Sequence, residues 1–416
     1  MNDHFQRAKK VVDLINELAE ISEEKNCITR TFGTKAFVET SKKISSWMKE
    51  IGLDTRIDNI SNVRGKLSCS IPDAKTLVIG SHFDSVVNAG KFDGPLGIVL
   101  GLDLIQHLIN SKKQLPFNME LIAFSDEEGA RFHTAYLGSK VVSGSFDNSL
   151  LEKEDAASVT LREAIHSIGG DSKKLIEDSI AGKNWAGYFE IHIEQGPVLY
   201  DKNIPVGIVS GIAGQKRIEI IFNGIGGHAG TVPMEMRSDA LCAAAEFILA
   251  VENFAFTNKE NMVATIGKLE IFNAASNVIP GKVFCSLDLR SPQASILSPA
   301  CEALNKSCKE ICMRRGLLFE WNLVLESNPV ACDEQMSSIL QKTITDSGYE
   351  VVWLVSGAGH DAVPISEIAP VAMMFVRCFQ GISHNPSENV ELKDIAAAIH
   401  VSDNFILNLI DKFKQQ

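Results

Sequence analysis

The chain has 416 residues, a net charge of −12 and 45% hydrophobic residues. This composition supports a large packed core in about two or three domains and argues against intrinsic disorder. An acidic chain gains little from phosphate contacts, so nucleic acid is a poor partner, and no basic run favours a membrane surface.

The N-terminal residues are charged throughout and do not resemble a signal peptide. The most apolar stretch, 240–256, is interrupted by Glu246 and Glu252. With nine scattered cysteines and no Cys-x-x-Cys pair, we expect a cytoplasmic protein.

The first half of the chain alternates helix-like and strand-like segments. Apolar residues at helical spacing predict helices over 5–21, 35–51 and 96–108. Short apolar runs predict buried strands over 76–81, 119–125 and 188–193. This alternation predicts an α/β domain with a mainly parallel sheet, in which functional residues usually lie at the carboxyl ends of the strands.

The middle of the chain has a different order of elements. Its pattern is β-α-β-β-α-β, a ferredoxin-like arrangement, over segments 216–223, 238–256, 262–272, 282–290, 298–315 and 317–325. The α/β pattern then resumes with strands over 350–355 and 370–376 and a helix from Leu392. We therefore predict a domain over 211–326, inserted between the two parts of a larger domain, 1–210 and 327–416.

Histidines and acids recur where predicted strands end. His82 and Asp84 follow the first of these strands, and Asp93 lies in a Gly-flanked loop. The adjacent pair Glu127 and Glu128 follows the second strand. Adjacent side chains at a strand end point to different sides, so one carboxylate can bind metal while the other stays free as a base. His192 ends the third strand, and His384 lies after the last one.

A mixed set of His and carboxylate ligands suits Zn²⁺ or Mn²⁺ better than Ca²⁺ or Mg²⁺. Two such ions, about 3.5–4 Å apart, can share one hydroxide that attacks an amide or urea carbon, and a bridging carboxylate holds ions that close. Each residue alone has a simpler interpretation as a polar surface group. The recurrence of the set favours a metal site, with Asp84 orienting His82 rather than binding metal itself.

The inserted segment carries further candidates. His228 lies in a Gly-rich loop, Asn277 in the motif NVIPG, and Arg290 at the end of a predicted strand. Arg suits bidentate capture of a carboxylate, although a surface charge at a strand end is the simpler alternative for Arg290. The Gly-rich turn at 356–362 offers backbone N–H groups to an anion.

In these motifs, from GSHFDS to SHNPSE, the sequence resembles the dinuclear amidohydrolases related to aminoacylase and carboxypeptidase metallopeptidases. The subgroup it resembles contains allantoate amidohydrolase, N-carbamoyl-L-amino-acid hydrolase and β-ureidopropionase. The resemblance implies two divalent ions per subunit, one bound by His82 and His192 and the other by Glu128 and His384, with Asp93 as the bridge.

The same resemblance implies roles for the remaining candidates. Glu127 would be the general base, and His228 would reach across a homodimer interface to stabilise the oxyanion. The substrate carboxylate would be held by Gln195, Asn277, Arg290 and the backbone near Gly359. The inserted domain would form the dimer contact and close as a lid.

The motifs GIAGQ, HAGTVPM, SNVIPG and FVRCFQGISHNPSE are most similar to those of allantoate amidohydrolases. A small anionic ureido substrate is therefore expected, with allantoate first and an N-carbamoyl-L-amino acid second. A dipeptidase is disfavoured by His192. A catalytically silent binding protein on this fold is disfavoured because Glu127 and all the ligands are present.

Overall fold

The computed structural model describes residues 2–415 and divides the chain into two compact units. The larger unit consists of Met1–Ser210 and Cys332–Gln416, and the smaller unit is the continuous segment Gly211–Ala331. Each unit has its own cluster of buried apolar side chains. The smaller unit is therefore built around a core of its own, and it ends at Ala331, five residues after the predicted boundary at 326.

The larger unit is built on a nine-stranded sheet with the order β1-β2-β4-β3-β5-β15-β6-β13, and β14 pairs with β6. Its central strands β4, β3, β5 and β15 run parallel to one another. Strand β2 pairs antiparallel with β4 on one side, and β6 pairs antiparallel with β15 on the other. The sheet is therefore mixed. The expected parallel arrangement holds only for its centre, where strands are almost wholly buried and read as continuous apolar runs.

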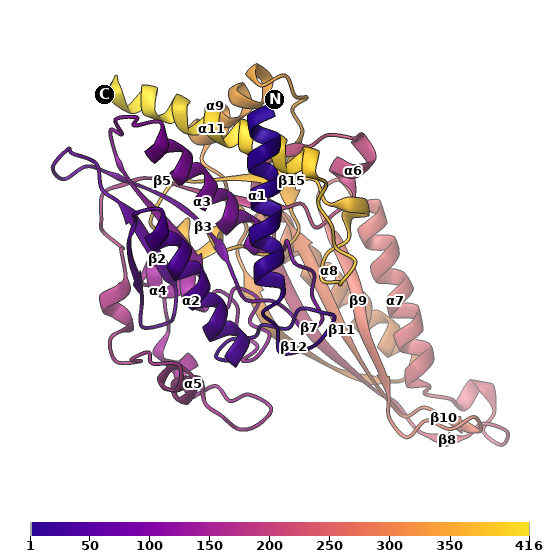
Figure 1. The fold of residues 1–416 in the computed structure, drawn as a ribbon. Coiled ribbons are helices and arrows are strands. Elements are labelled where there is room, and N and C mark those ends of the chain that lie inside the picture. The colour runs from indigo at the N-terminus through magenta and orange to yellow at the C-terminus, as the bar shows by residue number, and fades with distance from the viewer. Residues whose placement is uncertain (1, 416) are drawn as a thin grey trace. The chain divides into compact units, whose positions relative to one another are not determined.

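The strands of this sheet are β1 (Asp54–Ile57), β2 (Val63–Leu67), β3 (Thr76–His82), β4 (Asn118–Phe124), β5 (Trp185–Ile193), β6 (Val206–Ile212), β13 (Val330–Ala331), β14 (Trp353–Ser356) and β15 (Val371–Val376). The helices of the larger unit are α1 (Asn2–Ala19), α2 (Lys35–Glu50), α3 (Pro95–Asn110), α4 (Leu137–Ser143), α5 (Leu161–Ser167), α6 (Val198–Lys202), α9 (Glu334–Asp346), α10 (Ala362–Ile365) and α11 (Leu392–Lys414). Helix α3 packs against β3 and β5, and the first and last helices, α1 and α11, pack side by side (Figure 1).

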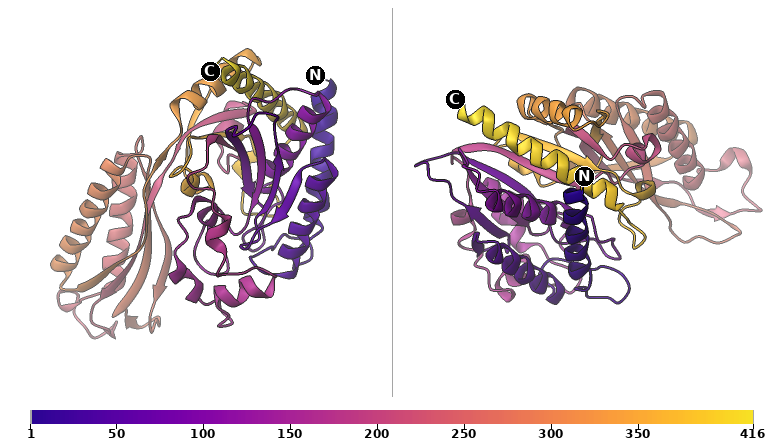
Figure 2. Two further views of the ribbon diagram at one scale, coloured as in Figure 1. Left: turned by 90° about the vertical axis from the view of Figure 1, so that its left-hand side faces the viewer. Right: turned by 45° about the horizontal axis from the view of Figure 1, so that its top comes forward.

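The smaller unit has a four-stranded antiparallel sheet with the order β12-β7-β11-β9. Its elements are β7 (Gly214–Asn223), β8 (Gly227–His228), α7 (Ala240–Thr257), β9 (Val263–Ile271), β10 (Val278–Ile279), β11 (Lys282–Ser291), α8 (Ala294–Arg315) and β12 (Leu318–Ser327). Helices α7 and α8 pack beside each other on one face of the sheet (Figure 2). The short strands β8 and β10 form a separate two-stranded ribbon.

Helix α7 is the most apolar long helix of the chain. Among the described residues it alone is long and apolar enough to cross a membrane by length and composition. Asp239 caps its start by accepting hydrogen bonds from the N–H groups of Leu241 and Cys242. One side of the helix, including Phe247 and Val251, is buried in the core of the smaller unit. The other side, including Leu249 and Phe256, is exposed, so only one face of this apolar helix contributes to the core.

Candidate metal centre

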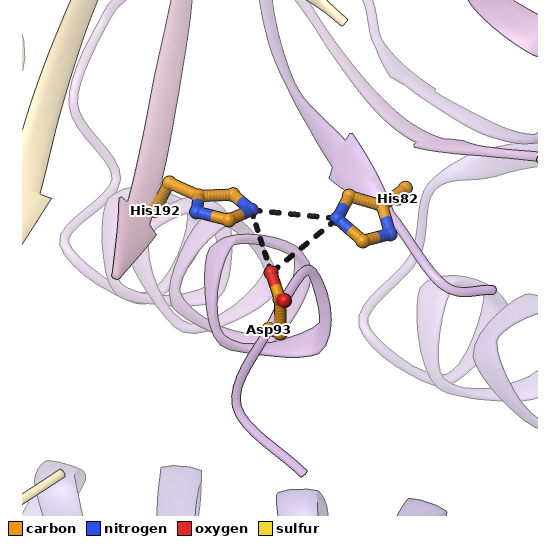
Figure 3. A group of neighbouring side chains, drawn as sticks. All are labelled: His82, Asp93 and His192. Carbon is orange, nitrogen blue, oxygen red and sulfur yellow. Dashed lines mark hydrogen bonds and ion pairs between the residues drawn. The ribbon is translucent and has the colours of Figure 1, made fainter. Parts of the chain in front are cut away.

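Three predicted ligands meet at the carboxyl ends of the central strands (Figure 3). His82 is the last residue of β3, and His192 lies near the end of β5. Asp93 comes from the loop that precedes α3. All three side chains are buried, with at most 4% of each residue exposed. Because β3 and β5 are parallel neighbours, two histidines far apart in sequence reach the same edge of the sheet.

The Asp93 carboxylate faces two groups of candidate ligands, one with each oxygen. Its Oδ1 lies 3.2 Å from His192 Nε2 and 3.8 Å from His82 Nε2. Its Oδ2 lies 3.1 Å from His384 Nε2, and that nitrogen lies 3.4 Å from Glu128 Oε1. In each group the candidate ligand atoms are all within 4.8 Å of one another. One carboxylate shared by two ligand groups is the arrangement that a pair of bridged cations requires.

The hydrogen bonds of the two buried histidines fit a cation between them. His82 Nδ1 lies 3.2 Å from the backbone oxygen of Asp84, and His192 Nδ1 lies 3.1 Å from that of Ile193. Each Nδ1 therefore donates to a carbonyl, and the two Nε2 atoms approach each other at 3.4 Å. Asp93 Oδ1, which they both face, is buried without a hydrogen-bond partner. Three lone-pair atoms aimed at one point suit a divalent cation.

The electrostatics of this cluster favour positive charge at its centre. Burial opposes a charge on His82, but its contacts with Asp84 and Asp93 raise its pKa well above the usual range. Burial lowers the pKa of His192 to about 4, so this ring is neutral. Asp93 is also buried, which opposes its charge, yet the nearby ring nitrogens of His384 and His82 hold its pKa well below the usual range. The carboxylates thus create a negative potential, which either a proton or a metal ion can neutralise.

Glu127 and Glu128 both face the cluster. Strand β4 ends at Phe124, so the pair lies in a loop and strand alternation does not separate their side chains, contrary to our expectation. Their carboxylates lie with His82 in a group whose ligand atoms are within 4.8 Å of one another. The Asp84 carboxylate accepts hydrogen bonds from the N–H groups of Glu127 (3.1 Å) and Glu128 (3.2 Å). Asp84 therefore positions this loop as well as His82, because its Oδ1 lies 3.5 Å from His82 Nδ1.

The two acids differ in their surroundings. Glu127 is buried, and this burial raises the pKa of its carboxyl well above the usual range, with the charge of Glu128 acting in the same direction. Glu128 is partly exposed and faces His384. A buried carboxyl with a raised pKa suits the role of a proton acceptor, whereas a carboxylate beside a histidine suits that of a ligand.

Strained backbone surrounds the cluster. Asp126, Gln195 and His384 adopt positive φ angles of 51°, 57° and 53°. Such conformations cost about 1–3 kcal/mol each for residues other than glycine and gather at functional sites. Gly94 has a φ of 81°, and a Cβ there would lie 2.5 Å from the backbone oxygen of His82. Only glycine at this position allows the Asp93 loop to approach the end of β3.

Gln195 and Gly359, both expected to contact substrate, lie in the larger unit. Gln195 donates from Nε2 to Asp93 Oδ2 at 2.9 Å, and the same atom lies 3.3 Å from His384 Nε2. This places Gln195 against the candidate ligands themselves. Gly359 lies against Tyr136, because a Cβ at Gly359 would come within 1.7 Å of the tyrosine hydroxyl.

The other expected substrate contacts lie in the smaller unit. His228 is exposed, and its Nδ1 accepts a hydrogen bond from the N–H of Gly230 at 3.1 Å. Asn277 is exposed next to β10, and its backbone oxygen accepts from Ala229. The guanidinium of Arg290 donates to both carboxylate oxygens of Asp288, at 2.7 and 2.9 Å. A substrate carboxylate at Arg290 would therefore share the guanidinium with Asp288.

Several buried polar residues near the cluster were not predicted from the sequence. The Glu388 carboxylate accepts hydrogen bonds from the N–H groups of Phe92 and Asp93, at 2.7 and 3.1 Å, and from the hydroxyl of Ser383 at 3.0 Å. Burial raises the pKa of Glu388 to about 7. Glu190, buried in β5, has a pKa raised by burial to about 8. The sequence holds a feature that could have pointed to each residue. Glu388 lies four residues after the candidate ligand His384, and Glu190 is an acid inside an otherwise apolar strand.

Comparisons with known proteins place the whole chain among amidohydrolases of similar length. A protein from Glycine max named allantoate deiminase 2 is 37% identical, over 96% of this chain and 89% of its own. An N-carbamoyl-L-amino-acid amidohydrolase from Pseudomonas sp. (strain NS671) is 36% identical, over 93% of this chain and 94% of its own. The crystal structure of an amidase of the hydantoinase/carbamoylase family from Burkholderia multivorans superposes with a TM-score of 0.90 at 32% identity, covering 97% of both chains.

The resemblance inferred from the motifs is thereby confirmed, and the chain is a hydrolase. Residues 72–408 match the model of peptidase family M20/M25/M40. This span includes the strands that carry His82 and His192 as well as the loop of His384. The fold, the cluster of candidate ligands and the similar proteins lead to one conclusion: the chain belongs to peptidase family M20/M25/M40.

Proposed function

We propose that this protein hydrolyses the ureido group of a small carboxylate substrate, with allantoate as the first choice. The observation that carries the proposal is the shared Asp93 carboxylate, with His82 and His192 at one oxygen and His384 and Glu128 near the other. We infer that the two ligand groups hold two divalent ions, Zn²⁺ or Mn²⁺. When bound, such ions lower the pKa of water from about 15.7 toward about 7 and polarise the substrate carbonyl.

The residues of the chain supply the proton transfers. Glu127 takes a proton from the attacking water and returns it to the departing nitrogen, as its position beside His82 and Glu128 allows. Asp84 keeps the Glu127 loop in place through the two backbone N–H groups. The overall reaction, R–NH–CO–NH₂ + H₂O → R–NH₂ + CO₂ + NH₃, then balances in atoms and protons.

A panel of substrates tests the proposal. Ammonia release would be measured with the metal-loaded protein on allantoate and on several N-carbamoyl-L-amino acids, with Glu127→Gln as the inactive control. We expect the highest kcat/KM for allantoate. The similar N-carbamoyl-L-amino-acid amidohydrolase makes the carbamoyl amino acids the second candidate. A tenfold or greater preference for one of these would replace our first choice, and no ammonia from any of them would reject the whole class.

We also propose a homodimer formed through the smaller unit, in which His228 acts in the site of the partner. Several large apolar side chains exposed on this unit support an interface there, among them Leu249, Phe256, Val263, Leu318 and Val324. Sedimentation should give a dimer, and Leu249→Glu with Phe256→Glu should shift it toward monomer. Mixing His228→Ala chains with Glu127→Gln chains should restore activity only if His228 acts in trans.

A further inference from the structure

A cavity of about 160 Å³ lies in the larger unit, away from the candidate metal centre. Side chains of β1, β2 and β4 line it together with the first residues of β3 and β5, Thr76 and Trp185, and the segment that leads into β5. His82 and His192 are at the other ends of β3 and β5. At about 3.3 Å per residue, the cavity lies about 20 Å from the metal centre.

The lining of this cavity is positively charged, although the chain as a whole has a net charge of −12. It includes four cationic side chains, Arg56, Arg64, Lys66 and Lys183, but only two anionic ones, Asp54 and Glu120. A cleft lined mostly by one sign of charge focuses the field and attracts counter-ions, so this cavity favours an anion although the protein is acidic.

The two arginines are held in place by carboxylates, Glu120, which also lines the cavity, and Asp178. Arg64 is 4% exposed, and its guanidinium contacts Glu120 at 2.6 Å and the backbone oxygen of Asp178 at 2.8 Å. Arg56 pairs with the Asp178 carboxylate at 2.6 Å. In the register of β1 and β2, Arg56 and Arg64 are directly opposite each other. Like charges in directly opposed positions repel, and an anion in the cavity would relieve this repulsion.

The two lysines form no close ion pair, although Asp54 is directly opposite Lys66 in the register of β1 and β2. Neither Lys66 nor Lys183 has a carboxylate within 4.0 Å of its amine among the residues that the structure describes. Partial desolvation, and after it the positive charge of Arg64, lowers the pKa of Lys183. Thr76 and Asn184 add a hydroxyl and an amide to the lining, and Trp185 adds an aromatic wall. The cavity therefore combines two ion-paired arginines, two lysines and neutral polar groups around one open space.

We propose that this cavity is a binding site for a small, doubly charged oxyanion of the phosphate class, separate from the site of hydrolysis. The buried Arg64 forms its floor, and Arg56, Lys66 and Lys183 contact the anion from the rim. Because the cavity adjoins the beginnings of β3 and β5, the bound anion stabilises the strands that carry His82 and His192.

Titration of the 416-residue protein with inorganic phosphate tests the proposal. The probes are the fluorescence of Trp185 and the Tm, with sodium chloride at matched ionic strength as the reference. We expect saturable binding, which Lys66→Gln with Lys183→Gln weakens by about tenfold or more. The matched control is Lys49→Gln with Lys173→Gln, which removes the same charge from exposed lysines elsewhere. Trp185→Phe should abolish the fluorescence change and keep the phosphate-dependent rise in Tm.

Titrations with other anions test whether the site selects a doubly charged oxyanion. Sulfate should compete with phosphate, whereas acetate, with one charge, should bind at least tenfold more weakly. Phosphate also raises the Tm of many proteins without binding, so the decisive quantity is the difference between the two double variants. An equal phosphate response in wild type and both double variants would overturn the proposal. So would acetate binding as tight as phosphate, because the site would then not select a doubly charged anion.

Discussion

The two compact units differ in how far they assemble the groups that a reaction needs. In the larger unit, His82, Asp93 and His192 are buried and converge on one point, with Glu127 beside them. In the smaller unit, His228 and Asn277 are exposed, and Arg290 is engaged by Asp288. Groups that stabilise developing charge must be fixed beforehand by the fold, whereas groups that recognise a ligand are completed by the ligand itself. We therefore expect substitutions in the first set to remove turnover and substitutions of Asn277 or Arg290 to weaken binding, whereas substitution of His228, proposed to stabilise the oxyanion, should affect turnover as well.

The largest effect should come from Asp93→Asn. The amide keeps the size of the side chain but cannot serve both ligand groups as an anionic bridge, so both metal positions should be lost. Activity should fall by about 10⁴-fold or more. Metal analysis of the purified variant should find fewer ions per chain than in wild type. The exposed Asp13→Asn is the control, and a variant at Asp93 that keeps both ions and its activity would contradict the shared bridge.

Glu127→Gln should lower kcat by about 10²–10⁴-fold while the metal content stays at the wild-type level. The amide cannot accept the proton from water, but it leaves the candidate ligands intact. Metal content and kcat, measured on the same preparation, separate a base from a ligand. If the ions are lost together with turnover, Glu127 binds metal and the division of roles between Glu127 and Glu128 is wrong.

Arg290→Lys tests the other side of the comparison. An ammonium group cannot hold a carboxylate in the bidentate manner of a guanidinium, so KM should rise by about 10–100-fold with a smaller change in kcat. Arg217→Lys is a matched control, since Arg217 also contacts Asp288, at 3.0 Å. Equal effects of the two substitutions would show that Arg290 acts through the stability of the smaller unit rather than through substrate.

The smallest expected effect is on metal loading as a function of pH. The hydrogen bond with Asp93 is the main cause of the raised pKa of His384, which is about 10. This ring is therefore protonated at neutral pH before metal binds. The metal must displace that proton, and its affinity should therefore rise about tenfold per pH unit between pH 6 and 8. Equilibrium dialysis at several pH values measures this. Loading that is independent of pH would contradict the predicted role of His384.

The sequence predicted the elements with strong apolar patterns and missed those with mixed ones. Helices α1, α3 and α7 lie within a few residues of their predicted bounds. Strand β2 (VRGKL) was overlooked because its cationic side chains resemble those of a loop. It forms because it pairs with β4, to which Arg64 is tied through Glu120. Pairing between distant segments leaves no local pattern to read.

The same limit applies to the site. Motif order was enough to propose the candidate ligands, since parallel strands bring their carboxyl ends to one edge. The positions of both carboxylates of Glu127 and Glu128 depend on a loop in which Asp126 has a φ of 51°, and no periodicity predicts such a loop. The contact of Gln195 with Asp93 likewise depends on a left-handed residue, Gln195 itself, with a φ of 57°.

The place of β15 in the sheet has a consequence for how the protein is made. This strand lies between β5 and β6, yet it is synthesised only after the whole smaller unit. The smaller unit is one continuous segment and can fold as soon as it leaves the ribosome. The central sheet of the larger unit stays incomplete until β15 has been synthesised, and His384 leaves the ribosome after that strand. During that interval the exposed edge of β5 is open to wrong pairing, so the nascent chain depends on the speed with which its last part arrives.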